Sequence, residues 1–249
     1  MGCLFGLPDM KRDNTMDIEE NVHRIKEEIA AAARAAGRDP AEILLVAASK
    51  MNDAGRVQRA IRAGVPVCGE NRVQEMLEKQ REHAYAGARL HFIGHLQKNK
   101  ARQVVGLCEL IHSVDSVELL REIDRCAQKK QCVQDVLLEI NIGREDSKSG
   151  LLPEMLPDAL EEAARLPAVR VRGLMAIPPV SRGVDSNRPF FSQMEKLFVD
   201  NARKKYDNIH MDFLSMGMSH DFQTAIACGA NIVRIGTAIF GERRYPEKP

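Results

Sequence analysis

The sequence predicts a single α/β domain folded as a TIM-type (β/α)₈ barrel. The chain has 249 residues, a length common for one domain of this architecture. Along it, about eight short apolar runs alternate with segments of helical periodicity, which is the pattern of a parallel sheet covered by helices. A closed barrel and an open doubly wound sheet both satisfy this alternation. The strand count, the length and the lack of an early GxGxxG fingerprint favour the barrel.

The start of the chain differs from the rest. The first fifteen residues mix glycine, proline and charges without a period, so we interpret residues 1–15 as a flexible extension and residues 16–249 as the barrel domain. From Asp17, apolar residues recur at three- and four-residue steps, which predicts a helix that Gly37 ends. Pro40 then opens a turn before the first buried strand.

The elements that follow alternate strictly between strand and helix. The expected strands are Ile43–Ser49, Val65–Gly69, Leu90–Gly94, Leu110–Ser113, Val136–Ile142, Val171–Ile177, His210–Met216 and Ile232–Ile235. The expected helices are Ala54–Ala63, Asn71–His83, Asn99–Gly106, Ser116–Lys130, Leu152–Leu166, Asn187–Lys205 and Asp221–Cys228, with a short helical turn after the last strand. No linker or repeat interrupts this order, so we expect one domain.

Composition argues against several classes of function. Charged residues make up 29% of the chain with a net charge of +1, and no concentrated basic face suggests a nucleic-acid partner. No apolar run reaches the roughly eighteen residues of a membrane helix, and no signal-peptide pattern opens the chain. The six cysteines lack CxxC spacing, and the histidines form no HxH or HExxH pattern. We therefore expect a cytoplasmic protein with free thiols and no metal site.

The first strand ends in a lysine, Lys50. Active sites of such barrels lie at the carboxyl ends of the strands, so this amine is expected at the mouth of the barrel. Partial desolvation there lowers a lysine pKa and leaves more of the free amine, which attacks carbonyl groups. The alternative is a lysine that only extends to solvent from a strand end.

Glycine-containing loops follow the last two strands. One runs from Ser215 to Asp221 and the other from Arg234 to Ala238, and each leads into a helical turn. Glycines let the backbone approach an anion, and Ser or Thr at a helix start adds a hydroxyl to free N–H groups. Barrel enzymes commonly hold phosphate at these two loops. The alternative is a pair of ordinary helix caps with glycine turns.

Arg234 interrupts an apolar strand two residues before Gly236, which places both residues on one face. If the glycine faces the barrel mouth, the arginine points inward and needs a partner. That partner is either a carboxylate, such as Glu139 or Asp115, or an acceptor on a ligand. Further polar residues lie near other strand ends, in segments 70–71 and 91–100 and at Asn141. Each is either a hydrogen-bonding group that supports the site or, equally, a loop or cap residue.

Together these motifs resemble a known family, the pyridoxal phosphate homeostasis proteins. The matching stretches are Ala47–Lys50, Gly69–Asn71, Val73–Glu75, His91–Gly94, Leu96–Gln97, Asn99–Lys100, Glu139–Ile142, Ser147–Gly150, Arg172–Ile177, Leu214–Ser219 and Val233–Gly241. These stretches occur in the order of the family, and the likeness as a whole runs from about Asp17 to the C terminus. The resemblance implies a barrel similar to the N-terminal domain of alanine racemase and pyridoxal 5′-phosphate as the cofactor.

The resemblance also implies a role for particular residues. Lys50 carries the cofactor as a Schiff base, and Arg234 faces the pyridine nitrogen. Ser219, Gly236 and Thr237 hold the phosphate. The other residues that line the cofactor are Asn71, Asn141, Met175 and Met216. No residue is assigned a catalytic role.

The function implied is that of a non-catalytic protein. It carries or buffers the cofactor and so maintains vitamin B6 and amino-acid pools. An arginine cannot give the ring nitrogen a proton, which leaves the ring a poorer electron sink. Apo-enzymes that need the cofactor are the expected partners, and a monomer is expected. The main alternative is a single-domain amino-acid racemase, although none of the three tyrosines lies in a second domain of the kind that supplies a racemase base. A Schiff-base aldolase acting on a phosphosugar is a third, more distant possibility.

Four positions depart from the family pattern. Asn52 stands where a second lysine is usual, Arg72 replaces a tyrosine, His95 a proline and His220 an acidic residue. The Asn52 difference removes a cation beside Lys50, so cofactor release and exchange are the properties that these departures affect most directly.

Overall fold

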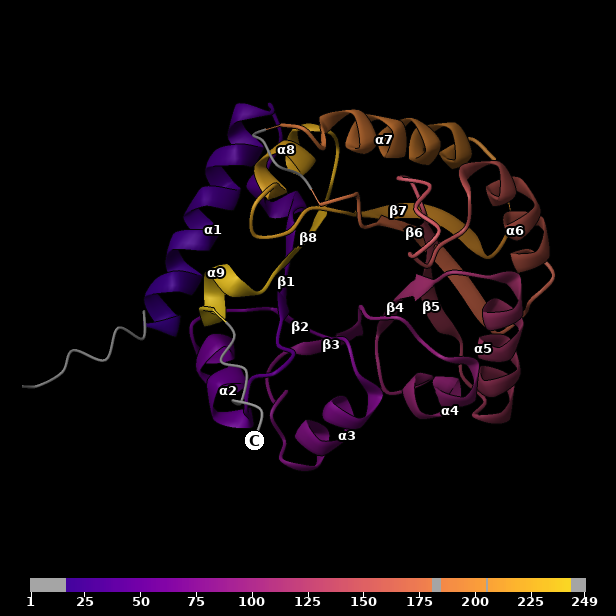
Figure 1. Ribbon diagram of the computed structural model, residues 1–249. Helices are drawn as coiled ribbons and strands as arrows, with labels where there is room; N and C mark the ends of the chain where they lie inside the picture. Colours follow the sequence, from indigo (N-terminus) through magenta and orange to yellow (C-terminus); the bar gives the residue numbers. More distant parts are fainter. Residues whose placement is uncertain (1–16, 181–184, 205, 243–249) are drawn as a thin grey trace, which may run out of the picture.

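The structure, a computed structural model, describes residues 17–180, 185–204 and 206–242. Within these residues, eight parallel strands close into a barrel in the order β1 to β8, and helices surround it (Figure 1). The predicted barrel is confirmed and the open-sheet alternative is wrong. The predicted extension, residues 1–15, lies outside the described residues, as does Lys205 at the end of one predicted helix.

The strands lie close to the predicted ranges. They are β1 (Leu44–Ala48), β2 (Val67–Glu70), β3 (Arg89–Phe92), β4 (Leu110–Val114), β5 (Gln134–Ile140), β6 (Val169–Ala176), β7 (Ile209–Ser215) and β8 (Ile232–Ile235). The start of β2 differs from the prediction because Gly64, with φ of +96°, and Pro66 form the turn that precedes it. The strand therefore begins at Val67 rather than at Val65.

The α-helices are α1 (Ile18–Ala35), α2 (Ala54–Arg62), α3 (Val73–Arg81), α4 (Ala101–Val104), α5 (Val117–Lys129), α6 (Leu156–Ala163), α7 (Arg188–Ala202), α8 (Phe222–Ala227) and α9 (Thr237–Phe240). Short 3₁₀ turns η1 (Pro40–Glu42), η2 (Lys98–Lys100) and η3 (Pro153–Met155) precede β1, α4 and α6. The predicted helix at 152–166 begins later, at Leu156, because Pro153 starts the 3₁₀ turn. Among the described helices, none is long and apolar enough to cross a membrane.

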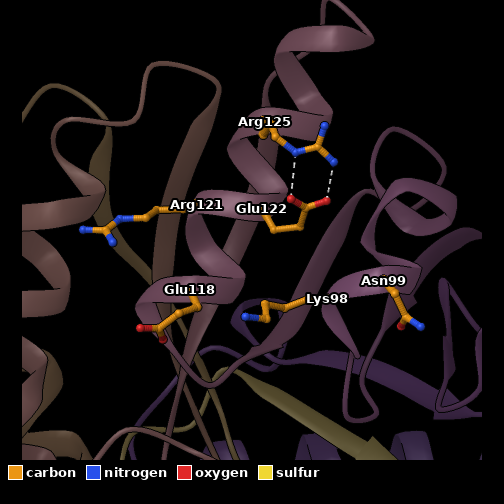
Figure 2. A pocket seen from close by; sticks show the side chains of 6 residues that line it. All are labelled: Lys98, Asn99, Glu118, Arg121, Glu122 and Arg125. Carbon is orange, nitrogen blue, oxygen red and sulfur yellow. Dashed lines mark hydrogen bonds and ion pairs between the residues drawn. The ribbon is translucent and has the colours of Figure 1, made fainter.

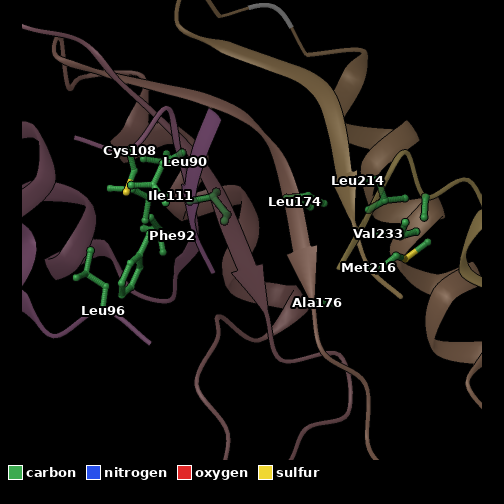
Figure 3. Close-up of a cluster of buried hydrophobic side chains, with 14 of the residues drawn as sticks. Leu90, Phe92, Leu96, Cys108, Ile111, Leu174, Ala176, Leu214, Met216 and Val233 are labelled. Carbon is green, nitrogen blue, oxygen red and sulfur yellow. The ribbon is translucent and has the colours of Figure 1, made fainter. Parts of the chain in front are cut away.

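The barrel has two apolar layers, as the alternation of side chains along each strand requires. The lumen is filled by a cluster of buried residues from the strands and the strand ends, namely Val46, Val67, Ile93, Leu110, Leu137, Met175 and Ile232. A larger cluster lies between the strands and the helices; Figure 3 shows part of it, including Phe92, Ile111, Leu174 and Leu214. The lumen is therefore a packed core, and a functional site can form only where the carboxyl ends of the strands open to the surface.

A charged network lies at the amino-terminal ends of β5 and β6. Asp135 accepts hydrogen bonds from Arg170 at 2.7 and 3.0 Å and from Arg172 at 2.7 Å. Arg172 also reaches Asp212 at 2.6 Å, and its guanidinium lies 5.1 Å from the ring centre of Phe213, which packs against the lumen cluster. This network closes the floor of the barrel and leaves the carboxyl ends of the strands as the open side.

Candidate functional site

Lys50 lies directly beyond the carboxyl end of β1, in a tight turn, and is half-buried. The N–H of Ser49 donates to Gly69 O at 3.0 Å, and the N–H of Asn52 donates back to Ser49 O at 3.2 Å. The side-chain amide of Asn52 donates to Lys50 O at 3.0 Å. The lysine backbone is therefore fixed by hydrogen bonds on several sides, as expected for a residue that must place its amine accurately.

The pairing of β1 with β8 brings Lys50 close to the predicted anion loops. Val46 pairs with Arg234 and Ala47 with Ile235. A Cβ placed on Gly236 would lie 3.5 Å from the Cβ of Ala48, the last residue of β1. Only Ser49 separates Ala48 from Lys50. Thus a lysine and a glycine loop far apart in the sequence meet at neighbouring strand ends.

Two backbone N–H groups of the last loop converge on one oxygen. The N–H groups of Gly236 and Ala238 each donate to Ser219 Oγ at 3.4 Å, and α9 begins between them at Thr237. Gly217, with φ of +92°, supplies the left-handed turn that leads to Ser219, and its carbonyl accepts from the N–H of Arg234 at 3.0 Å. Bonds of this length to a hydroxyl are weak, so an anionic oxygen would be the better acceptor.

The far end of α9 is held by α1 and α2, an arrangement not foreseen from the sequence. Asn21 Nδ2 donates to Ile239 O at 3.0 Å, and Arg24 donates to Ala238 O at 3.1 Å. Arg56 donates to Phe240 O and also to Asn52 Oδ1, the latter at 2.9 Å. These donors satisfy the carbonyls at the C-terminal end of the turn, and the two cations suit that end of its dipole. Arg56 also links α9 to the lysine turn through Asn52.

Arg234 lies in the lumen and is 4% exposed. Its guanidinium donates to Ser215 Oγ at 2.6 Å and to Ala176 O at 3.0 Å. Neither predicted carboxylate partner, Glu139 or Asp115, forms an ion pair with it in the described part of the chain. Burial lowers the pKa of Arg234 to about 10, so it stays protonated at neutral pH. A hydroxyl and a carbonyl thus take the place of the carboxylate partner, and the other expectation, an acceptor on a ligand, stays a prediction.

A chain of hydrogen bonds continues from Arg234 across the lumen. His112 Nδ1 lies 2.9 Å from Ser215 Oγ, and His112 Nε2 lies 2.9 Å from His91 Nδ1. Burial lowers the pKa of His91 to about 3 and places the pKa of His112 well below its usual value, so both rings are neutral. The part played by His112 and Ser215 was missed, because only barrel closure reveals which strand faces which across the lumen.

The remaining predicted lining residues are not all in equivalent places. Asn71 follows β2, and its Oδ1 is buried without a partner among the described residues. Asn141 bonds its own loop, accepting from Glu145 N at 3.1 Å and donating to Glu145 O at 2.9 Å. Met175 is in the lumen cluster, whereas Met216 belongs to the outer cluster beside Leu214 and Val233 (Figure 3). The lining roles of these residues stay predictions.

A second titratable group, Glu139 on β5, lies near the open end. Burial and the neighbouring Asp115 raise the pKa of Glu139 to about 7, while Arg234 and His95 oppose that rise. His95 Nδ1 lies 2.9 Å from Asp115 Oδ2 and 3.1 Å from Ser149 Oγ. The histidine that departs from the family pattern therefore joins three strand-end loops. Of the other three departures, Arg72 and His220 are exposed, and Asn52 is half-buried in the lysine turn.

A hollow elsewhere on the surface is a weaker candidate. It lies on η2 and α5 and is lined by Lys98, Asn99, Glu118, Arg121, Glu122 and Arg125 (Figure 2). Arg125 is already paired with Glu122 through bonds of 2.7 and 2.5 Å, and Arg121 with Glu162 at 2.7 Å. Because the guanidinium groups of Arg121 and Arg125 are already neutralised, this hollow offers no unpaired guanidinium to an anion, and we place the functional site at the barrel mouth.

Sequence comparison relates the chain to a known family of proteins. The family profile described as alanine racemase, N-terminal domain, matches residues 20–244. A protein of Aquifex aeolicus named pyridoxal phosphate homeostasis protein is 43% identical over 92% of this chain and 100% of its own length. A protein of the same name from Pseudomonas aeruginosa is 41% identical over 92% of this chain and 96% of its own.

Solved structures give the same result. PipY of Synechococcus elongatus, 32% identical, superposes with a TM-score of 0.81 without PLP and 0.78 with PLP bound. Both comparisons cover 90% of this chain and 100% of that protein. An alanine racemase of Clostridium difficile superposes with a TM-score of 0.65 at 16% identity, covering 91% of this chain and 58% of that protein. The last likeness is one of fold.

Proposed function

This chain belongs to the family of pyridoxal phosphate homeostasis proteins, built on the alanine racemase N-terminal domain, and we propose that it holds pyridoxal 5′-phosphate as a Schiff base on Lys50. The observation that carries the proposal is the meeting of β1 with β8. It places the lysine turn beside Gly236 and Ser219, where two N–H groups converge on a single oxygen. An amine for the aldehyde and donors for the phosphate are thus present on adjacent strands.

The residues at the barrel mouth fit the cofactor. The absence of a Cβ on Gly236 leaves its N–H open to an anion, and Ser219 and Thr237 add hydroxyl groups there. The buried Oδ1 of Asn71 has no partner among the described residues and is available to a hydrogen-bond donor on a ligand. Asn141, Met175 and Met216 complete the proposed lining, Met216 through its backbone because its side chain packs outward.

Arg234 is proposed to donate to the pyridine nitrogen. When bound, the cofactor supplies an electron sink, and its strength depends on protonation of that nitrogen. Arg234 keeps its own proton at neutral pH, since its pKa stays near 10, and so leaves the nitrogen unprotonated. Ser215 and Ala176 hold the guanidinium in place. This arrangement favours storage of the cofactor over carbanion chemistry.

We therefore propose a carrier without robust turnover, which buffers pyridoxal phosphate in the cytoplasm and hands it to apo-enzymes. The Aquifex and Pseudomonas relatives, at 43% and 41% identity, are named for homeostasis and not for a reaction, which supports this role. A monomer with one barrel domain over residues 16–249 is the proposed unit. The racemase alternative gains no support from any feature of the described site.

The decisive experiment is an absorbance spectrum of the purified protein after pyridoxal phosphate is added and the excess removed. The parent is expected to keep a Schiff-base band that Lys50→Ala loses. Lys130→Ala is the control, because Lys130 lies at the C-terminal end of α5, where it donates to Val105 O at 2.6 Å. A band that persists in Lys50→Ala would show that another lysine carries the cofactor, and no band in the parent would overturn the proposal.

The absence of turnover is tested separately. Amino acids carrying deuterium at the α-carbon are incubated with the loaded protein, and retention of the label is followed. Full retention is expected, since the proposed function includes no proton abstraction at that carbon. Exchange at ordinary enzyme rates would instead establish a racemase or a related enzyme.

A further inference from the structure

A buried cluster of charged residues lies behind the turn that carries Lys50. It consists of Glu70 at the end of β2 and of Glu75 and Lys79 on α3. Lys79 Nζ lies 2.8 Å from Glu70 Oε1 and 2.7 Å from Glu75 Oε1. The side chains of Glu70 and Lys79 are 0% and 7% exposed. Charges are rarely buried this deeply, because desolvation is costly, and their contacts therefore call for an explanation.

The cluster is bonded to both neighbours of Lys50. On one side, Lys79 Nζ donates to the carbonyl of Ser49 at 2.8 Å, and the Ser49 hydroxyl donates to Glu70 Oε1 at 2.7 Å. On the other side, the backbone N–H of Met51 donates to Glu75 Oε1. A single cation, Lys79, thus binds the carbonyl of Ser49 directly. It also joins Glu75, which accepts from Met51, to Glu70, which accepts from the Ser49 hydroxyl.

The turn needs such support. Met51 has φ of +61°, in the left-handed region that residues other than glycine seldom adopt. A backbone in this region persists only when its surroundings hold it. The bond from Met51 N–H to Glu75 acts at that residue itself. A turn held in one conformation gives Lys50 a fixed starting point, so less freedom is lost when its amine is joined to a ligand.

We propose that Lys79, together with Glu70 and Glu75, is a positioning group for Lys50 and sets how readily the lysine forms its Schiff base. The inference rests on the proposed function. In the reaction concerned, the free amine bonds the aldehyde carbon, and the aldehyde oxygen leaves as water with the two amine hydrogens. In this proposal Lys79 acts on Lys50 only indirectly, through the backbone of Ser49 and through Glu70 and Glu75.

Two ligands separate positioning of the amine from general damage to the site. Pyridoxal 5′-phosphate has the aldehyde, whereas pyridoxine 5′-phosphate has the same ring and phosphate with an alcohol in its place. Only the first makes use of the position of Lys50. The preference for the aldehyde, the ratio of the two dissociation constants, therefore measures the contribution of the lysine turn.

Because Lys79→Met leaves the buried Glu70 and the partly buried Glu75 without their cation, the principal variant is the double substitution Lys79→Met/Glu70→Gln, which also removes the buried charge. We expect its affinity for pyridoxal phosphate to fall by about tenfold or more, with the affinity for pyridoxine phosphate changed by about twofold at most. The rate at which the Schiff-base band appears should fall in parallel. Lys130→Met, which also removes a donor to a backbone carbonyl, should leave both affinities unchanged.

The possible results separate the two proposals. A variant that keeps the parent's preference for the aldehyde overturns the positioning role, and so does one that loses both ligands equally, because that result indicates collapse of the site. A parent protein with no preference for the aldehyde overturns the Schiff base on Lys50 itself. A parent with a clear preference, lost selectively in the variant, establishes the positioning role.

Discussion

Arg234 donates a hydrogen bond of 2.6 Å to the hydroxyl of Ser215, and the two residues come from adjacent strands, β8 and β7. On the other side of the same oxygen lies His112, at 2.9 Å, and His91 follows it. The charged guanidinium that we propose meets the cofactor is thus hydrogen-bonded to a series of neutral groups, Ser215, His112 and His91, that crosses the lumen. A proton added to His112 would stand near the Arg234 cation, which contributes to the low pKa of this histidine, after the larger effect of its burial.

The histidine pair should make the protein sensitive to acid. The pKa of His112 lies well below its usual value when folded, so its contribution to stability is present above about pH 6.5 and is lost as the pH falls. Between pH 6.5 and 5, a histidine with a folded pKa of about 3, as His91 has, costs about 2 kcal/mol. Urea unfolding at the two pH values should show that the free energy of unfolding falls less for His112→Asn than for the parent. His210→Asn, at an exposed position, should behave like the parent.

Glu139 should act in the opposite direction. Its pKa is raised from 4.5 to about 7, so its contribution to stability is full below about pH 4.5 and is lost as the pH rises through 7. Glu139→Gln resembles the protonated form. Its free energy of unfolding should therefore rise relative to that of the parent by about 3 kcal/mol between pH 4.5 and 7.5. The free energy of unfolding of the cofactor-free proteins measures this. A difference between the two proteins that does not vary with pH would contradict it, and the exposed Glu27→Gln is the control.

The floor of the barrel offers a prediction about stability alone. Asp135 accepts from both Arg170 and Arg172, and its side chain is 13% exposed. Asp135→Asn removes the charge from these bonds and should lower the free energy of unfolding by about 1–3 kcal/mol. Affinity for pyridoxal phosphate should not change, because the site is at the other end of the strands.

The control for this prediction is Asp200→Asn. Asp200 pairs with Lys196 on the exposed face of α7, at 2.6 Å, and its side chain is 50% exposed. Exposed pairs of this kind contribute little, so urea unfolding should not distinguish this variant from the parent. Equal losses in the two variants would mean that the floor network has no special role.

The architecture was predictable because each strand is a short apolar run and each helix repeats at helical spacing. The family resemblance is confirmed by the family profile and by the named relatives. Contacts made only on closure were not predictable. Asn21 and Ile239 lie 218 positions apart, and no local pattern indicates that one caps the other. The same is true of Lys79, which in the sequence is an ordinary helix lysine and in the structure is buried behind Lys50.

Arg234 illustrates the limit within the site. Its inward direction followed from strand alternation, which is local. Its partners within the protein did not, because a buried cation can be met by a carboxylate or by several neutral oxygens. From the sequence we expected either a carboxylate or an acceptor on a ligand, and not these neutral oxygens. The structure supplies a hydroxyl from β7 and a carbonyl from β6. The direction of Arg234, which its own strand sets, was therefore predicted, and its partners on neighbouring strands were not.

Gly236→Ala should separate folding from ligand binding. A Cβ at this position would lie 3.5 Å from Ala48 Cβ and from Ala48 O, which is ordinary contact, and φ is −115°, so the backbone does not require glycine. The variant should fold with a free energy of unfolding within about 1 kcal/mol of the parent. The added methyl group, however, stands beside the N–H proposed to donate to the phosphate. Affinity for pyridoxal phosphate should fall by about tenfold or more.

Gly173→Ala is the informative contrast, because its φ is +142° and a Cβ there would lie 1.9 Å from Phe213 O. That variant should fail to fold, which thermal unfolding detects before any ligand is added. Titration of Gly236→Ala with pyridoxal phosphate and with inorganic phosphate then tests the anion site. Weakened binding of both ligands by a folded protein locates the phosphate at the start of α9. Unchanged binding of both would place it elsewhere, since a methyl group cannot occupy the same space as a phosphate oxygen.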